Sequence, residues 1–83
     1  MSKKEKLIAR LKAKPKDFTF DEAKTLLDLC GYIMSNAGKT GGSRVIFTRN
    51  QKVFRMHKPH PRKELLLYQI KELIDELKGE GLL

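Results

Sequence analysis

Two apolar-alternating runs around a short polar turn constrain this fold more than any other feature of the sequence. The runs cover residues 43–48 and 53–58, are rich in Val, Ile and Phe, and are separated by the polar residues 49–52. Runs of this kind on both sides of a polar turn predict a β-hairpin. The stretch that holds the hairpin is therefore expected to form part of an antiparallel sheet.

The alternation also predicts the register of this hairpin. Pairing Phe47 with Phe54 across the turn pairs Val45 with Met56 on the same face. Because a strand alternates its side chains between two faces, all four of these apolar side chains then lie together. This face of the hairpin is expected to pack in the core.

The other face of the hairpin is expected to point outward. The same register places Arg44 opposite His57, and Ile46 opposite Arg55. An arginine, a histidine and a second arginine would therefore be neighbours on the solvent side of the sheet.

Two helices are predicted before the hairpin. Residues 3–13 carry apolar side chains at helical spacing, and Pro15 ends that pattern. Thr19 and Glu22 then have the spacing of a capping box, with Phe18 before them as a hydrophobic staple. The expected buried stripes consist of Leu7, Ile8 and Leu11 in the first helix, and Ala23, Leu26, Leu27 and Cys30 in the second.

The remaining segments complete an α+β domain. Gly31 suits the left-handed position after the second helix, and residues 32–34 are expected to form a short strand. A last helix should begin soon after Pro61 and end at Gly79, with a buried stripe of Leu66, Leu67, Ile70, Leu73, Ile74 and Leu77. The predicted fold is a three-stranded antiparallel sheet with helices on one face.

The length of 83 residues predicts a single domain over 1–83 with a modest core. Its longest apolar runs are too short for a membrane span, and the charged N-terminus lacks the pattern of a secretory signal, so we expect a cytoplasmic protein. The single cysteine, Cys30, is expected to be buried and inert, without a disulfide or a zinc site. We expect neither a cofactor nor a metal.

Positive charge is concentrated in two blocks. The net charge is +8, and residues 39–63 hold eight Lys or Arg and both histidines but no Asp or Glu. Residues 1–16 form the other basic block, which can be explained as a solvated helix face at a soluble start of the chain. A field of this kind attracts phosphate backbones, so nucleic acid is the leading partner and acidic protein the next.

Several short motifs occur in an order that resembles a known family. Gly42 and Ser43 precede the hairpin, and Pro59-His60-Pro61 follows it and leads into the last helix. In residues 20–78 the chain is similar to the HicA toxins of toxin–antitoxin pairs, which leaves residues 1–16 as a basic N-terminal extension. The resemblance implies an αβββα fold like that of double-stranded-RNA-binding domains, metal-independent endoribonuclease activity, and an acidic HicB-like antitoxin as partner.

One position departs from the family pattern. HicA toxins carry a histidine after Gly-Ser, taken to be catalytic, and this chain has Arg44 there. An arginine can hold a phosphate but is a poor general base. We therefore hypothesise that His57 is the base, with Arg44 and Arg55 on the phosphate and Ser43 hydrogen-bonded nearby. His60, at the family's Pro-His-Pro position, is either a further catalytic group or a residue that packs the corner between strand and helix.

A non-catalytic RNA-binding or antitoxin-binding module is the alternative. The candidate RNA contacts are Ser43, Arg44, Arg55, Lys39, Lys58, Arg62 and Lys63. For Lys39, Arg49, Lys52 and Lys58, taken singly, a solvated rim of the hairpin is favoured over a specific contact. DNA binding ranks last, because no segment has the pattern of a recognition helix. The sequence does not specify an oligomeric state.

Overall fold

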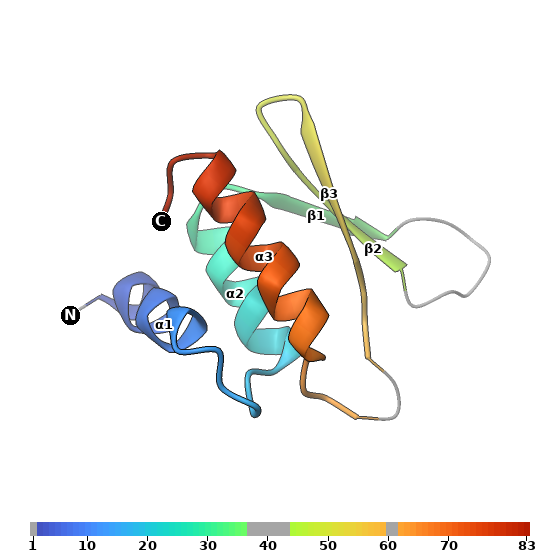
Figure 1. The fold of residues 1–83 in the computed structure, drawn as a ribbon. Coiled ribbons are helices and arrows are strands. Elements are labelled where there is room, and N and C mark those ends of the chain that lie inside the picture. The colour runs from blue at the N-terminus through green and yellow to red at the C-terminus, as the bar shows by residue number, and fades with distance from the viewer. Residues whose placement is uncertain (1, 37–43, 60–61) are drawn as a thin grey trace.

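The computed structural model describes residues 2–36, 44–59 and 62–83, and these form three helices and a three-stranded antiparallel sheet (Figure 1). The elements are α1 (Lys3–Lys12), α2 (Phe20–Leu29), β1 (Ile33–Asn36), β2 (Arg44–Arg49), β3 (Lys52–His57) and α3 (Leu67–Gly79). This order confirms the predicted α+β class and the predicted sequence of elements.

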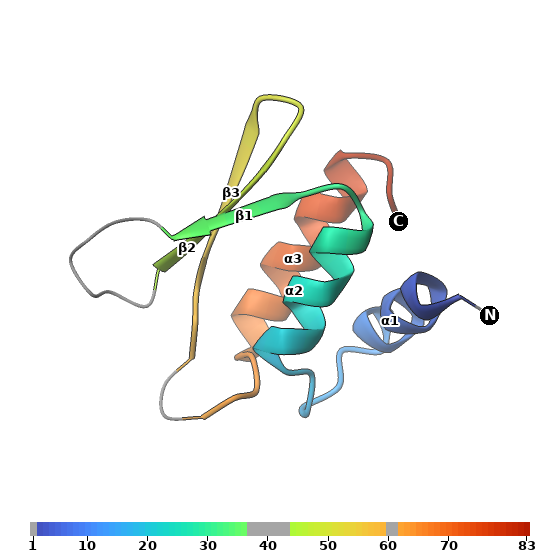
Figure 2. The ribbon, with the colours of Figure 1, turned by 180° about the vertical axis from the view of Figure 1, so that it is seen from behind.

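The helices lie on one side of the sheet. In Figures 1 and 2, α2 and α3 stand between α1 on one side and the sheet on the other. The strands follow the order β1-β2-β3, so β2 is central. The core fills the space between helices and sheet, and its largest fully buried side chains are Phe18, Phe47, Leu11, Leu26, Leu27, Leu65, Ile70, Leu73 and Leu77.

No helix among the described residues is long and apolar enough to cross a membrane.

The predicted hairpin register is confirmed. Phe47 pairs with Phe54, and Val45 pairs with Met56. Val45, Phe47 and Met56 are buried, and the partly buried Phe54 packs against the same core. The inner face of the hairpin is therefore apolar, as the alternation of the sequence requires.

The hairpin turn contains only two residues outside the strands. Asn50 and Gln51 have φ values of 51° and 69°. Positive φ at both central residues is the geometry of a type I′ turn, which matches the twist of the two strands. Asn is a favoured residue there, whereas Gln51 adopts a conformation that L-residues other than Asn and Asp rarely take.

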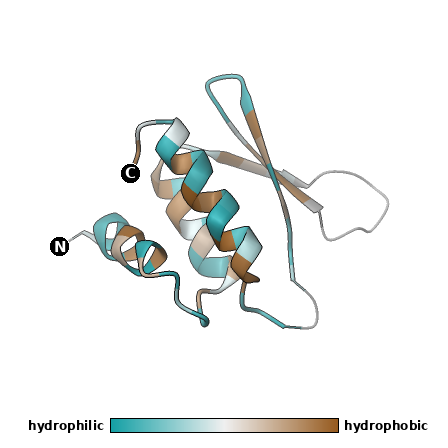
Figure 3. Cartoon of the chain, in the orientation of Figure 1, coloured by the Kyte–Doolittle hydropathy of each residue, from teal (hydrophilic) through white to brown (hydrophobic). Residues whose placement is uncertain are grey.

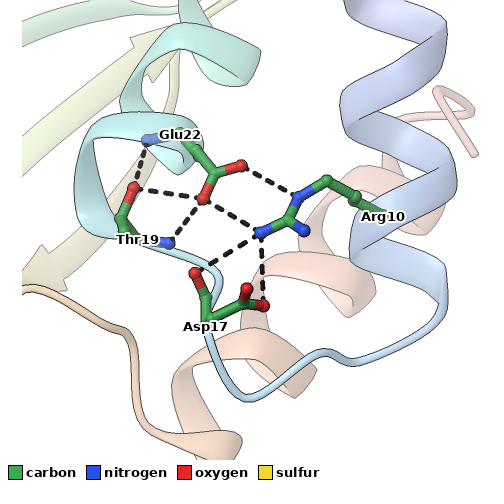
Figure 4. Close-up of polar contacts among 4 residues, drawn as sticks. All are labelled: Arg10, Asp17, Thr19 and Glu22. Atoms are coloured by element: carbon green, nitrogen blue, oxygen red, sulfur yellow. Dashed lines mark hydrogen bonds and ion pairs between the residues drawn. The ribbon is translucent and has the colours of Figure 1, made fainter.

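The predicted capping box at the start of α2 is present and has an additional partner (Figure 4). The Thr19 hydroxyl accepts a hydrogen bond from the Glu22 amide at 3.1 Å, and Glu22 Oε1 accepts one from the Thr19 amide at 3.0 Å. Arg10 of α1 donates from Nε to Glu22 Oε2 at 2.9 Å. Burial alone would raise the pKa of Glu22, but these hydrogen bonds hold that pKa below its ordinary value.

The N-terminal helix is packed into the same core as the rest of the chain. Leu7 and Leu11 are buried, and Ile8 packs against them at the edge of the core. The guanidinium of Arg10 also lies 5.6 Å from the centre of the Phe18 ring. Apolar burial and the pair with Glu22 therefore hold α1 against the start of α2.

Helices α2 and α3 end in the same way. Gly31 has a φ of 94°, as predicted for the residue after α2, and the Tyr32 amide donates to the Leu27 carbonyl at 2.9 Å. After α3, which ends at Gly79 as predicted, Gly81 has a φ of 73° and the Leu82 amide donates to the Leu77 carbonyl at 2.8 Å. These are Schellman motifs, which satisfy the last carbonyls of a helix.

The start of α3 differs from the prediction. Leu66 and Leu67 were expected on the buried stripe, but α3 begins only at Leu67, and these two residues are 41% and 56% exposed. Leu65, which precedes the helix, is 2% exposed and occupies the core instead. The prediction that Leu66 and Leu67 are buried is therefore wrong.

Pairing with the segment before α2 explains this late start. The Phe20 amide donates to the Lys63 carbonyl at 3.0 Å, and the Leu65 amide donates to the Phe18 carbonyl at 2.8 Å. Thr19 and Glu64 form an antiparallel bridge between these bonds. Because residues 63–65 are held extended by distant partners, helical periodicity in the sequence could not indicate where α3 begins.

Candidate nucleic-acid interface

The outer face of the sheet, which points away from the helices, divides into an apolar and a cationic part. Near the turn, Thr48 pairs with both Ile33 and Val53, whose side chains are 70% and 48% exposed. Toward the other end of β3 the outer positions are Arg55 and His57, which are both exposed. The cationic part thus lies at the end of the hairpin that is farthest from its turn.

The pairing on which the His57 hypothesis rests is present. Arg44 and His57 are partners in the ladder between β2 and β3, and Ile46 and Arg55 are the next pair on the same face. Residues directly opposite in an antiparallel ladder have Cβ atoms within about 5.5 Å of each other and share one face of the sheet. The predicted register for the candidate residues is therefore confirmed.

A buried glutamine fixes the position of His57. Gln69, in the first turn of α3, is only 4% exposed. Its Nε2 donates to the His57 carbonyl at 2.7 Å, and its Oε1 accepts from the Leu66 amide at 3.0 Å. One side chain thus joins the end of β3 to the beginning of α3. The sequence analysis did not identify Gln69, although an uncharged polar residue beside Ile70 on the buried side of a helix was a usable signal.

Further cations continue from the end of β3 toward α3. Lys58, Arg62 and Lys63 are exposed, and Lys58 Nζ lies 6.0 Å from the centre of the Phe20 ring. Since the Phe20 amide also binds the Lys63 carbonyl, Lys58 and Lys63 both lie close to Phe20. The name "cationic stripe" is used below for Arg55, His57, Lys58, Arg62 and Lys63.

The cations beside the turn have a different environment. Arg49 Nη1 lies 2.8 Å from Glu80 Oε1, and Lys52 Nζ lies 2.7 Å from Glu80 Oε2. Arg49 also donates from Nε to the Cys30 carbonyl at 3.1 Å. Hydrogen bonding with Lys52 lowers the pKa of Glu80, and the same contact raises the pKa of Lys52. Arg49 and Lys52 therefore join the hairpin to the end of α3, which is more than the solvated rim that the sequence suggested.

The stripe carries charge that is not neutralised within the described part of the chain. The ion pairs found there use Arg10, Arg49 and Lys52 as their cations, and none uses a residue of the cationic stripe. Arginine and lysine side chains that stay exposed and unpaired can contact phosphates and release counterions.

Part of the candidate set lies outside the described residues. This holds for Lys39, Ser43 and His60 and for the side chain of Arg44, so their proposed contacts stay predictions.

The described residues contain no group of three or more His, Cys, Asp or Glu side chains that could hold a metal ion. Cys30 is buried, as predicted, and burial raises the pKa of its thiol. The thiol is thus poorly suited to act as a nucleophile.

Comparison with protein-family models, with curated proteins and with solved structures found no match for this chain. The resemblance to HicA toxins therefore rests on the motifs alone.

Proposed function

We propose that this chain is an RNA-binding protein of the HicA type that cleaves RNA with His57 as its general base. The observation that carries the proposal is the ladder pairing of His57 with Arg44, beside the exposed Arg55. This pairing supports the proposal that Arg44, as the cation, and His57, as the general base, act on the same phosphate.

The cationic stripe would bind the phosphate backbone of the RNA. Arg55 and Arg62 can each hold a phosphate through two parallel hydrogen bonds, while Lys58 and Lys63 act as point charges. Contacts of this kind recognise the shape of the backbone and carry little sequence information. The affinity should therefore fall steeply as salt increases.

Cleavage would proceed by attack of the ribose 2′-oxygen on the adjacent phosphorus. His57 accepts the proton of the 2′-hydroxyl, and Arg44 and Arg55 stabilise the charge that develops on the phosphate oxygens. The bond from phosphorus to the 5′-oxygen breaks, and His60 in its protonated form donates a proton to that leaving oxygen. The products are a 2′,3′-cyclic phosphate and a free 5′-hydroxyl, and no metal is required.

A second candidate function is RNA binding without cleavage. Among the described hydrogen bonds, His57 takes part through its backbone carbonyl, and none orients its imidazole. A general base is usually held in position by a second polar group, so this observation favours a binding module. In that case Arg44 would serve only as a phosphate contact.

The test uses a fluorescently labelled RNA and the same RNA with 2′-deoxy substitutions. Cleavage and binding are measured for the wild type, His57→Ala and His60→Ala, with Lys24→Gln on α2, outside the cationic stripe, as a control. We expect cleavage that the 2′-deoxy substitution abolishes and that His57→Ala reduces by about 100-fold or more. Equal cleavage by the wild type and His57→Ala would remove His57 from the mechanism. Binding without cleavage would select the second candidate, and absence of binding would reject both.

A protein partner would be an acidic HicB-like antitoxin that covers the cationic stripe. Charge complementarity supports this part of the proposal, because the stripe attracts acidic protein as well as phosphate. The chain is expressed in bacteria with and without the open reading frame next to its gene. Growth arrest that the neighbouring frame relieves would support a toxin, whereas harmless expression of the chain alone would contradict it.

A further inference from the structure

A second cationic surface lies on the side of the helices that faces away from the sheet. Two adjoining hollows are both lined by Lys14. The first lies between the end of α1 and α3, and the second lies between residues 14–16 and the start of α3. Together they form what is called below the α1–α3 groove. Its lining consists of Lys12, Lys14, Pro15, Lys16, Arg62, Leu65, Leu66, Leu67, Ile70, Lys71, Ile74, Asp75 and Lys78.

Exposed apolar side chains line one part of this groove, which is called its floor below. Leu66 and Leu67 belong to this part and are 41% and 56% exposed, and Figure 3 shows that the start of α3 is apolar. These are the residues that helical periodicity assigned to the core. Two adjacent exposed leucines in the lining of a hollow favour contact with another apolar surface over contact with water.

The rim of the groove is almost entirely positive. Lys12, Lys14, Lys16, Lys71 and Lys78 are all exposed, and Asp75 is the single acidic residue among the described lining residues. An occupant with complementary chemistry needs carboxylates for the rim and aliphatic side chains for the floor. A nucleic acid provides negative charge but no aliphatic side chains, so it fits the floor poorly.

We propose that the α1–α3 groove binds an acidic amphipathic helix of another protein. The leucine-type side chains of that helix pack on Leu66 and Leu67, while its carboxylates face the lysines of the rim. In this binding mode a helix inserts into a groove, and apolar side chains spaced one helical turn apart make the main contacts. The proposal does not depend on RNA binding, since its residues lie outside the cationic stripe except for Arg62 at the boundary.

The backbone at Lys14 is a further observation in support. Lys14 follows the end of α1 with a φ of 50°, and its amide donates to the Leu11 carbonyl at 2.9 Å. Glycine is the preferred residue for this left-handed position, and a residue with a Cβ is disfavoured there. A lysine at this position is unfavourable for the fold, which is understandable if its charge is used in the groove.

Binding is tested with a fluorescein-labelled synthetic peptide on the full chain. The peptide has about 18 residues, with leucines one helical turn apart and glutamates between them. The controls are a scrambled peptide of the same composition and a peptide with glutamine in place of every glutamate. We expect saturable binding of the first peptide that weakens with salt, and at least about tenfold weaker binding of both controls.

Two substitutions separate binding from folding. Lys14→Gly removes a rim charge and suits the left-handed backbone. Leu66→Ser removes an anchor and supplies a side-chain cap to α3, which has no such hydrogen bond from Leu66. Each substitution should preserve or raise the melting temperature. Each should also weaken the affinity for the peptide by about tenfold, which is the effect of losing one good contact. Lys24→Gln, an exposed position on α2 outside the groove lining, is the matched control and should leave peptide affinity unchanged.

Defined outcomes would overturn the proposal. Equal affinity for the designed and scrambled peptides would show general charge attraction only. Unchanged affinity in Lys14→Gly and Leu66→Ser would place the peptide elsewhere. Displacement of the peptide by single-stranded RNA or by phosphatidylglycerol vesicles, but not by the unlabelled peptide, would assign the groove to nucleic acid or to a membrane surface.

Discussion

The two ends of the β2–β3 hairpin both carry basic residues, but these residues have different environments. Beside the turn, Arg49 and Lys52 are both paired with Glu80 after α3. At the opposite end, Arg55 and His57 are exposed, and no described ion pair includes them. A basic stretch that is uniform in sequence is therefore divided in space into cations that hold the fold and cations that remain available to a ligand.

The largest change in the free energy of unfolding is expected for Gln69→Ala, which affects the end of the hairpin that is farthest from its turn. The substitution removes two partly buried hydrogen bonds, one to the His57 carbonyl and one from the Leu66 amide, and each such bond contributes about 0.5–1.5 kcal/mol. We expect the free energy of unfolding to fall by about 2 kcal/mol in urea denaturation. Lys71→Ala, on the exposed side of the same helix, is the control and should change it by less than about 0.5 kcal/mol. An equal loss in both variants would show that Gln69 does not anchor the strand.

Gln51→Gly should have the next largest effect on the free energy of unfolding, which it should raise. Gln51 has a φ of 69°, which glycine adopts without steric cost. We expect the free energy of unfolding to rise by up to about 1 kcal/mol. Asn50→Gly should give a smaller gain, because asparagine already tolerates this conformation. A loss of stability in Gln51→Gly would contradict the type I′ turn.

Glu80→Gln tests the paired end with a smaller expected loss of stability. The pKa of Glu80 is lowered in the folded protein, so its contribution is present above the unfolded value of 4.5 and is lost as pH falls through the folded pKa. Thermal unfolding from pH 7 to pH 3 should therefore show a weaker pH dependence in Glu80→Gln than in the wild type. RNA affinity should not fall, since the cations released lie outside the cationic stripe. Parallel pH profiles for the two proteins would argue against the Glu80 pairs.

The smallest effect on stability is expected for Arg55→Gln. This exposed residue has no described ion pair, so its substitution should change the free energy of unfolding by less than about 0.5 kcal/mol. RNA affinity, in contrast, should fall, and the slope of its logarithm against the logarithm of salt concentration should decrease by about 1. Fluorescence anisotropy at several salt concentrations measures both. An unchanged slope would remove Arg55 from the phosphate contacts.

Most of the fold could be predicted from local patterns in the sequence. The hairpin register followed from alternation, and the capping box of Thr19 and Glu22 followed from a spacing of three residues. Both depend on neighbours along the chain, so they could be predicted without knowledge of the tertiary structure. The same holds for Gly31, because the end of a helix is a local event.

Features that depend on distant partners could not be predicted. Glu80 lies far along the chain from Arg49 and Lys52, and a count of charges does not pair them. The exposed position of Leu66 depends on how residues 63–65 pair with the segment before α2. The register of the candidate site was therefore predicted from the sequence, whereas the α1–α3 groove was not.

The two-sided contact of Gln69 has a thermodynamic consequence. The amide hydrogen of Leu66, whose side chain lines the α1–α3 groove, is held by the same residue that holds the His57 carbonyl on the sheet. Deuterium uptake at the Leu66 amide should consequently slow when either surface is occupied. A ligand on the sheet and a ligand in the α1–α3 groove can be coupled through Gln69. If one of them changes the affinity of the protein for the other, the factor must be the same in both directions, because coupling between two binding equilibria is reciprocal.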